Sequence, residues 1–215
     1  MSRASAADLP EPVAVAILAK APLPGFAKTR LAPALGQNGA AALQARLIER
    51  AVETARLADV GPVTLWAAPD QDHPAFQTLA ALFGVGLARQ PDGDLGARML
   101  AAIVAAQAPT IVIGTDCPAL QPAHLRAAAE ALAGGVDVVV VPVEDGGYAL
   151  IGMREPQPAL FSDMPWSTAG VMAATRHRLT HLGLSWREPA RLWDVDLPED
   201  VERMKREGLA ALMDS

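Results

Sequence analysis

Short unbroken runs of apolar residues alternate along the chain with longer segments in which apolar residues recur at helical spacing. The first run, Val13 to Ala19, has the pattern of a strand that is buried on both faces. From Gln37 to Ala58, leucine, isoleucine and alanine recur every three or four residues, which predicts a helix. Strands that alternate with helices pair in parallel through helical crossovers. The pattern therefore predicts an α/β protein.

The same alternation predicts the elements that follow along the chain. We expect strands at 63–67, 85–89, 110–114 and 136–141, and helices at 74–83, 95–106 and 121–132. After these, Glu144 to Gly147 forms a tight turn before an apolar run from Tyr148 to Gly152, which predicts a hairpin. The remainder predicts a helix at 167–181, a short strand at 191–195 and a final helix after Pro198.

These elements predict a three-layer α/β sandwich with a mostly parallel sheet and a small antiparallel addition. The chain of 215 residues is long enough for one full α/β domain, and we see no repeat or linker within it. We therefore expect one domain at residues 13–215 after a flexible N-terminus at residues 1–12.

Composition and charge exclude several classes of function. The formal net charge of −6 argues against binding to nucleic acid or to anionic membranes, which both depend on clustered lysine and arginine. No apolar run approaches the roughly 18 residues that a membrane span needs. The single cysteine, Cys117, excludes an internal disulfide and a multi-cysteine metal site. Since residues 1–12 also lack the pattern of a signal peptide, we expect a cytoplasmic protein.

The loop after the first strand collects basic residues around a glycine. Lys20, Lys28, Thr29 and Arg30 surround the sequence Pro-Leu-Pro-Gly25, and the whole chain has only three lysines. A glycine lets backbone N–H groups approach a phosphate, while lysine and arginine supply positive charge. The loop is either a phosphate site or a solvated surface loop. It is not a P-loop, and no Gly-x-Gly-x-x-Gly motif is present, which disfavours a dinucleotide-binding oxidoreductase.

A second candidate site lies after the strand at 110–114. Asp116 follows this buried strand directly, and ligands of open parallel sheets bind beyond the carboxyl ends of the strands. One or two carboxylates together with substrate phosphates are sufficient to bind Mg²⁺, and Asp194 and Asp196 are the candidate partners. The alternative is that Asp116 caps a helix or a turn.

Other reactive side chains have a functional and a structural interpretation. Cys117 is either a nucleophile or a small buried residue beside Asp116, and we favour the second. His177 and His181 are spaced for one helix face, but without the glutamate of a zinc protease motif they are more typical of exposed histidines. Trp166 either packs in the core or lines an acceptor pocket, and the neighbouring Ser167 either joins that pocket or caps a helix.

With these residues in place, the chain resembles the nucleotide-diphospho-sugar transferase superfamily. It is most similar there to the bacterial glycosyltransferase-A-like family DUF2064. The matching segments are 19–31, 93–99, 114–118, 144–152, 165–168 and 194–200. Residues 28–33 are also similar to the opening of 2-phospho-L-lactate guanylyltransferases. Residues 195–200 resemble the closing motif of CMP-Kdo synthetases and molybdenum-cofactor guanylyltransferases, with Leu197 where those motifs usually have threonine.

The resemblance implies a role for each segment in a GT-A-like fold. It implies that Asp116 and Asp196 hold Mg²⁺ or Mn²⁺ at the phosphates of a nucleotide donor, and that Asp145 is a candidate base. The implied nucleotide and phosphate ligands are Lys20, Gly25, Lys28, Arg30, Gly93, Asp94 and Gly96, of which Lys28 and Arg30 also neutralise the leaving phosphate. The implied acceptor side consists of Gly146, Gly147, Tyr148, Trp166 and Ser167.

Two reactions fit this arrangement. One is glycosyl transfer from a nucleotide sugar to a small acceptor, which we favour slightly. The other is nucleotidyl transfer from an NTP with release of pyrophosphate. A third possibility, from another class, is a non-catalytic nucleotide-binding module, because a fold alone does not determine a function. The sequence makes no prediction of the oligomeric state.

Overall fold

Strand β1 (Ala14–Lys20) lies inside a seven-stranded sheet whose strand order is β3-β2-β1-β4-β6-β5-β7. The structure is a computed structural model that describes residues 11–213. β1 pairs in parallel with β2 (Val63–Ala68) on one side and with β4 (Thr110–Ile113) on the other, and β2 pairs in parallel with β3 (Gly86–Arg89). β1 is apolar up to Lys20 because both of its faces are covered, as its sequence predicted.

The predicted hairpin is present, and its second strand lies inside the sheet. β5 (Val138–Pro142) and β6 (Tyr148–Met153) pair antiparallel, and β6 inserts between β5 and β4. β6 is the antiparallel strand of an otherwise parallel sheet, so the predicted fold class is confirmed. At the far edge, β5 pairs in parallel with the two-residue strand β7 (Trp186–Arg187).

Helices cover both faces of the sheet. One face packs against α1 (Ala32–Ala58), α2 (Pro74–Phe83) and α4 (Pro122–Ala133), and the other against α3 (Leu95–Ala106) and α5 (Val171–His181). Successive residues of β1 alternate between these two cores, as the pleat of a strand requires. The sheet and the helices on its two faces therefore form three layers.

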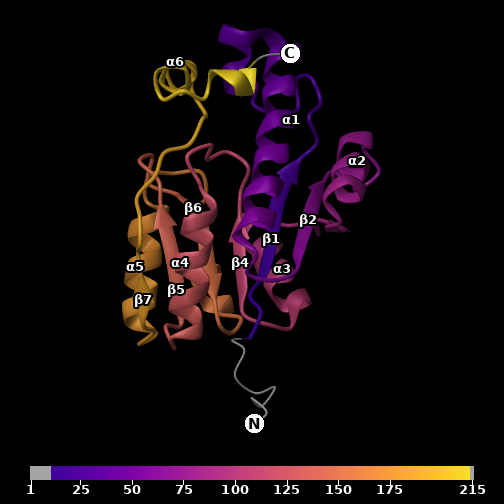
Figure 1. The fold of residues 1–215 in the computed structure, drawn as a ribbon. Coiled ribbons are helices and arrows are strands. Elements are labelled where there is room, and N and C mark those ends of the chain that lie inside the picture. The colour runs from indigo at the N-terminus through magenta and orange to yellow at the C-terminus, as the bar shows by residue number, and fades with distance from the viewer. Residues whose placement is uncertain (1–10, 214–215) are drawn as a thin grey trace.

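The C-terminal segment packs on the beginning of α1 rather than on the sheet. Helix α6 (Pro198–Arg206) contributes Val201 and Met204 to a third core with Leu43 and Leu47 of α1. Figure 1 shows α6 beside the start of α1, at the end of the molecule opposite the beginning of β1. Three 3₁₀ turns complete the elements: η1 (Thr29–Leu31), η2 (Pro158–Leu160) and η3 (Ala210–Met213).

Two predicted elements differ in the structure. The strand expected at 191–195 is wrong, because this segment makes only a single bridge, between Leu192 and Val143. The helix expected from Ser167 begins at Val171, since Ser167 has the left-handed φ of 62° and the chain is still turning there.

Two predictions about domain organisation are not tested by the structure. The flexible segment expected at residues 1–12 lies, apart from residues 11 and 12, outside the described residues. The single domain expected at residues 13–215 stays a prediction. Between residues 11 and 213, no helix has both the length and the apolar character that crossing a membrane requires.

Candidate active site

The candidate site lies between the carboxyl ends of β1 and β4. The chain leaves β1 toward β2 on one side, while β4 lies on the other side, so the strand order reverses at this point. Open α/β sheets bind ligands at such reversals. The loop after β1 supplies Lys28, and the loop after β4 supplies Asp116. A third segment joins them because the Val195 N–H donates to the Asp116 carbonyl oxygen at 2.8 Å.

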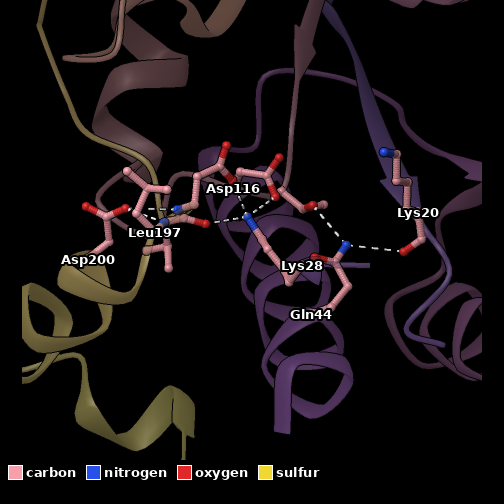
Figure 2. Close-up of polar contacts among 9 residues, drawn as sticks. Lys20, Lys28, Gln44, Asp116, Leu197 and Asp200 are labelled. Atoms are coloured by element: carbon pink, nitrogen blue, oxygen red, sulfur yellow. Dashed lines mark hydrogen bonds and ion pairs between the residues drawn. The ribbon is translucent and has the colours of Figure 1, made fainter. Parts of the chain in front are cut away.

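Lys28 is the centre of this site. Its Nζ lies 2.5 Å from Asp116 Oδ1 and 3.1 Å from Asp196 Oδ1, and it donates to the Val195 carbonyl oxygen at 2.5 Å. The side chain of Lys28 is only 4% exposed. Figure 2 shows the side chain of Lys28 directed toward Asp116. Three segments that are far apart in the sequence therefore meet at one positive charge.

The two carboxylates keep Lys28 charged in spite of its burial. Burial by itself lowers the pKa of Lys28, but the charges and hydrogen bonds of Asp116 and Asp196 outweigh it, so the pKa is raised above its ordinary value. The backbone of Lys28 has a left-handed φ of 51°, and Gly25 in the same loop has a φ of 75°. These two turns bring the side chain back toward the end of the sheet.

The aspartates of the site are open to solvent on their other side. The side chains of Asp116 and Asp196 are 52% and 42% exposed, and among the described residues their Oδ2 atoms accept no hydrogen bond from the protein. Asp194 is more enclosed, and its pKa is raised to about 6 by burial first, then by repulsion from Asp145, Asp196 and Asp116. Negative charge thus accumulates at this end of the sheet.

Gln44 of α1 supports the site through hydrogen bonds, and it was not among the site residues predicted from the sequence. Its buried amide Nε2 donates to the Lys20 carbonyl oxygen at 3.2 Å and to Thr115 Oγ1 at 3.3 Å, which ties the ends of β1 and β4 together (Figure 2). A signal was present, because Gln44 has the helical spacing of the core residues Leu47 and Ile48. A polar residue on the apolar face of a helix indicates a buried partner.

Asp200 holds the segment that carries Asp196. Its Oδ2 accepts from the backbone N–H groups of Asp196 at 3.0 Å and of Leu197 at 2.7 Å, at the start of α6 (Figure 2). The side chain thereby caps the helix and orients the preceding carboxylate. The closing motif of residues 195–200 therefore has one residue that faces Lys28 and one that fixes its backbone.

The other predicted phosphate ligands lie in the same loop but outside the ion-pair cluster. Lys20 and Arg30 are exposed, and among the described residues neither side chain takes part in an ion pair. A Cβ on Gly25 would lie 3.6 Å from the Gln37 side chain, which leaves room for one, so its positive φ is the feature that favours glycine there.

The predicted nucleotide segment before α3 has a local structural role. Asp94 caps the helix, with Oδ1 accepting from the Ala97 N–H at 2.8 Å, and Gly93 has a φ of 122°. Gly96 is buried, and a Cβ there would lie 2.8 Å from a ring carbon of Trp166. Gly96 thus provides close packing for the tryptophan.

The predicted acceptor residues come together on the β5–β6 side of the site. Gly146 has a φ of 95° and lies against the Ala169 backbone, and its carbonyl oxygen accepts from the Met172 N–H at 2.8 Å. The rings of Tyr148 and Trp166 meet edge to face with centroids 6.4 Å apart. The turn after β5 and the segment before α5 therefore form one wall.

Within this wall, several polar groups are left free or held locally. Asp145 Oδ1 accepts from the Gly147 N–H at 2.8 Å, which leaves its second oxygen free within the described structure. Trp166 Nε1 is buried and has no hydrogen-bond partner in that part of the chain. Ser167 is exposed. Burial also raises the pKa of the Tyr148 hydroxyl far above its ordinary value.

The remaining candidates do not contribute to the cluster. Burial, opposed in part by hydrogen bonds from the backbone, raises the pKa of Cys117 to about 12, so its sulfur is a thiol at neutral pH. The rings of His177 and His181 stack 6.5 Å apart on α5. Within residues 11–213, no group of three or more histidine, cysteine, aspartate or glutamate side chains is arranged to hold a metal.

The mostly parallel sheet with one antiparallel strand and helices on both faces is a GT-A-like fold. The profile of the family DUF2064, described as an uncharacterized protein conserved in bacteria, matches residues 50–168. This is more than half of the chain, so the protein belongs to DUF2064. A comparison with curated protein sequences finds no match.

Solved structures share this fold. A protein of Desulfovibrio desulfuricans G20, provisionally named a nucleotide-diphospho-sugar transferase, is 25% identical, with a TM-score of 0.80 over 94% of this chain and 96% of that one. CMP-2-keto-3-deoxy-manno-octonic acid synthetase is 14% identical, with a TM-score of 0.59 over 93% and 99%. Glucosyl-3-phosphoglycerate synthase of Mycobacterium tuberculosis is 12% identical, with a TM-score of 0.56 over 94% and 78%.

Asp116 and Asp196 fit a divalent cation. They come from two segments, converge on one positive group, have half-exposed side chains, and each retain an oxygen that accepts no hydrogen bond within the described residues. Mg²⁺ is typically held by one or two carboxylates together with substrate phosphates, so a pair without a third protein ligand is sufficient. The same oxygen donors suit Mn²⁺.

Proposed function

We propose that this protein transfers a glycosyl group from a nucleotide-diphosphate sugar to a small acceptor, with Mg²⁺ or Mn²⁺ held by Asp116 and Asp196. The convergence of these two carboxylates on one positive group, at the point where the strand order reverses, carries the proposal. Four aspartates at this end of the sheet repel one another and a polyphosphate, and a divalent cation held there would offset part of that repulsion.

The names of similar proteins support a nucleotide-activated donor. The Desulfovibrio protein has a provisional name of this class and is alike over nearly its whole length. The mycobacterial synthase was crystallised with Mn²⁺, UDP and glucosyl-3-phosphoglycerate, and the CMP-2-keto-3-deoxy-manno-octonic acid synthetase with CTP. The reaction of this chain nevertheless has to be argued from its own residues.

One group of these residues would bind the donor and another group would bind the acceptor. The bound cation would stabilise the negative charge of the departing diphosphate. Lys28 and Arg30 of the loop after β1 would neutralise the same phosphates, with Lys20 beside them. Gly93, Asp94 and Gly96 lie at the start of α3, where the nucleoside would rest.

The acceptor binds against the wall that consists of Gly146, Gly147, Tyr148, Trp166 and Ser167. The free oxygen of Asp145 takes the proton of the acceptor hydroxyl, since its other oxygen is held by the turn. The hydroxyl oxygen then forms a bond to the anomeric carbon. The bond from that carbon to the phosphate oxygen breaks, and the nucleoside diphosphate leaves.

Nucleotidyl transfer is a second candidate, and the loop after β1 favours it. Lys28 and Arg30 lie on a loop that ends beside the two aspartates, where the pyrophosphate of an NTP would leave. The two candidates share the site and differ in the bond that breaks. The product therefore distinguishes them.

The test measures donor binding and product formation in one set of reactions. Calorimetry with nucleotide sugars and NTPs, with and without Mn²⁺, identifies the donor, and mass spectrometry distinguishes a released nucleoside diphosphate from pyrophosphate. Asp116→Asn should abolish metal-dependent binding. Asp59→Asn is the matched control, because Asp59 is exposed at the opposite end of α1 and asparagine tolerates its left-handed φ of 53°. Donor binding without turnover would support a non-catalytic module, and binding without metal dependence would overturn the cation site.

A further inference from the structure

The ammonium of Lys28 has no donor left for a ligand. A lysine ammonium has three N–H donors. In this structure it contacts three protein acceptors, the Asp116 and Asp196 carboxylates and the Val195 carbonyl oxygen. With a side chain only 4% exposed, it is also closed off from solvent. In this position, Lys28 cannot bind a phosphate.

A divalent cation bound by Asp116 and Asp196 would compete for the position that the Lys28 ammonium occupies here. A Mg²⁺ ion bound by Asp116 and Asp196 would approach their oxygens to about 2.0–2.1 Å. Lys28 Nζ already contacts Oδ1 of both residues, at 2.5 and 3.1 Å. Two positive groups that share the same oxygens repel each other strongly. A cation that bound the Oδ1 atoms would have to displace the ammonium, and one that bound the free Oδ2 atoms would be repelled by it, so the two positive groups compete for the pair.

The side chain of Lys28 can leave this position more easily than the two aspartates can. Its charge is carried on a flexible four-carbon stem that lets the ammonium swing while the backbone stays in place. The loop around it contains no regular element between Ala21 and Lys28, whereas the aspartates are tied to β4 and to the start of α6. Of the three side chains, we therefore expect Lys28 to move and the carboxylates to stay in place.

We propose that Lys28 acts as a built-in counterion that competes with the divalent cation for the Asp116–Asp196 pair. In the free protein, the ammonium neutralises the pair. When the cation enters, Lys28 is displaced toward the solvent side, where its three donors become available to the phosphates of the donor. This inference rests on the proposed function, because it takes the two aspartates to be the cation ligands. It adds a sequence of events to that function, because the cation and the donor phosphates bind by replacing an internal ion pair.

Chemical labelling of the wild-type protein tests the displacement directly. The chain has only three lysines, and Lys20 and Lys205 serve as internal references for Lys28. Acetylation by an amine-reactive ester, followed by mass spectrometry, should modify Lys28 at least about tenfold more slowly than the two exposed lysines. Mn²⁺ alone, at saturation, should raise the rate at Lys28 several-fold and leave the references unchanged. An unchanged rate at Lys28 overturns the inference.

Metal affinity provides a second, independent measurement. Lys28→Met keeps the length of the side chain and removes its charge, so Mn²⁺ should bind at least about tenfold more tightly by calorimetry, without any nucleotide. Lys28→Gln should shift the affinity in the same direction and covers the case in which the methionine variant does not fold. Lys205→Met, whose ammonium pairs with Glu202 at 2.6 Å far along α6, should leave the affinity unchanged.

The outcomes separate this inference from the proposed function. If the wild-type protein binds Mn²⁺ and the Lys28 variants bind it equally or more weakly, only the competition is wrong. If neither the wild-type protein nor a Lys28 variant binds Mn²⁺, with or without a nucleotide, the cation site itself is wrong, and both proposals fall.

Discussion

The guanidinium of Arg203 donates two hydrogen bonds to the carboxylate of Glu144, at 2.7 and 3.1 Å. It also lies 4.4 Å from the ring centre of Trp193 and bonds Glu207 at 2.9 Å. Arg203 belongs to α6, while Glu144 immediately precedes Asp145 in the turn after β5. This pair therefore connects the C-terminal helix to the turn that carries the candidate base.

Arg203→Met should lower the free energy of unfolding at neutral pH. The hydrogen bonds from Arg203 lower the pKa of Glu144, so the pair stabilises the folded protein above the ordinary pKa of the glutamate. That contribution is lost as the pH falls through the lowered pKa. Denaturant unfolding at pH 7 and pH 3 measures it, and the difference between wild type and variant should shrink at the lower pH. Glu144→Gln should reproduce the loss, and an equal difference at both pH values contradicts the assignment.

Gly96→Ala should destabilise the protein by about 1–3 kcal/mol, the usual cost of overpacking. The added Cβ would lie 2.8 Å from Trp166 Cζ2 and 2.9 Å from Phe161 Cβ, and both groups are enclosed. Thermal unfolding measures the effect. Gly170→Ala is the control, because its Cβ would meet only Thr168 Oγ1 at 3.5 Å, and we expect a change within about 0.5 kcal/mol. Equal effects of the two variants would show that the packing around Trp166 is looser than described.

Gln44→Leu should cost about 1–3 kcal/mol, because it leaves the buried Thr115 hydroxyl and the Lys20 carbonyl without their partner. It should also weaken Mn²⁺ binding, since Thr115 precedes Asp116. Chemical unfolding and calorimetry measure the two effects. Gln77→Leu, on the exposed face of α2, should change neither. Lost stability with unchanged Mn²⁺ affinity would limit Gln44 to a structural role.

Cys117 should be alkylated by iodoacetamide at pH 8 at least about a hundredfold more slowly in the folded protein than in the unfolded chain. Its pKa of about 12 leaves very little thiolate, which is the reactive form. Cys117→Ala should retain Mn²⁺ binding and turnover. A folded protein that reacts rapidly, or a variant that binds Mn²⁺ and donor but does not turn over, would restore Cys117 as a candidate nucleophile.

The local pattern of apolar and polar residues was sufficient to predict most of the helices and strands. The bounds of α2 and α3 match the predicted segments 74–83 and 95–106, and the unbroken apolar runs became β1 and β4. Each of these elements is specified by residues within one window. The strand expected at 191–195 is absent because strand pairing depends on a distant edge, and this segment meets that edge only at the bridge between Leu192 and Val143, while Trp186 and Arg187 pair with the start of β5.

The candidate site was predicted as a set of residue types, without their contacts. The sequence indicated a basic loop, an aspartate at a strand end and a second aspartate in a closing motif. It did not indicate that Lys28 would pair with Asp116 and Asp196, because this pairing joins positions far apart in the chain. Gln44 was visible only as a polar residue on an apolar face, and its partners belong to two different strands.

By itself, the sequence determined the layered α/β architecture and the chemistry available at the carboxyl end of the sheet. It did so because hydrophobic periodicity and turn residues act over short distances along the chain. Only the tertiary structure decided that β6 enters the middle of the sheet and that the ammonium of Lys28 faces the two aspartates rather than solvent. Both depend on which distant segments become neighbours, and that follows from packing the whole core at once.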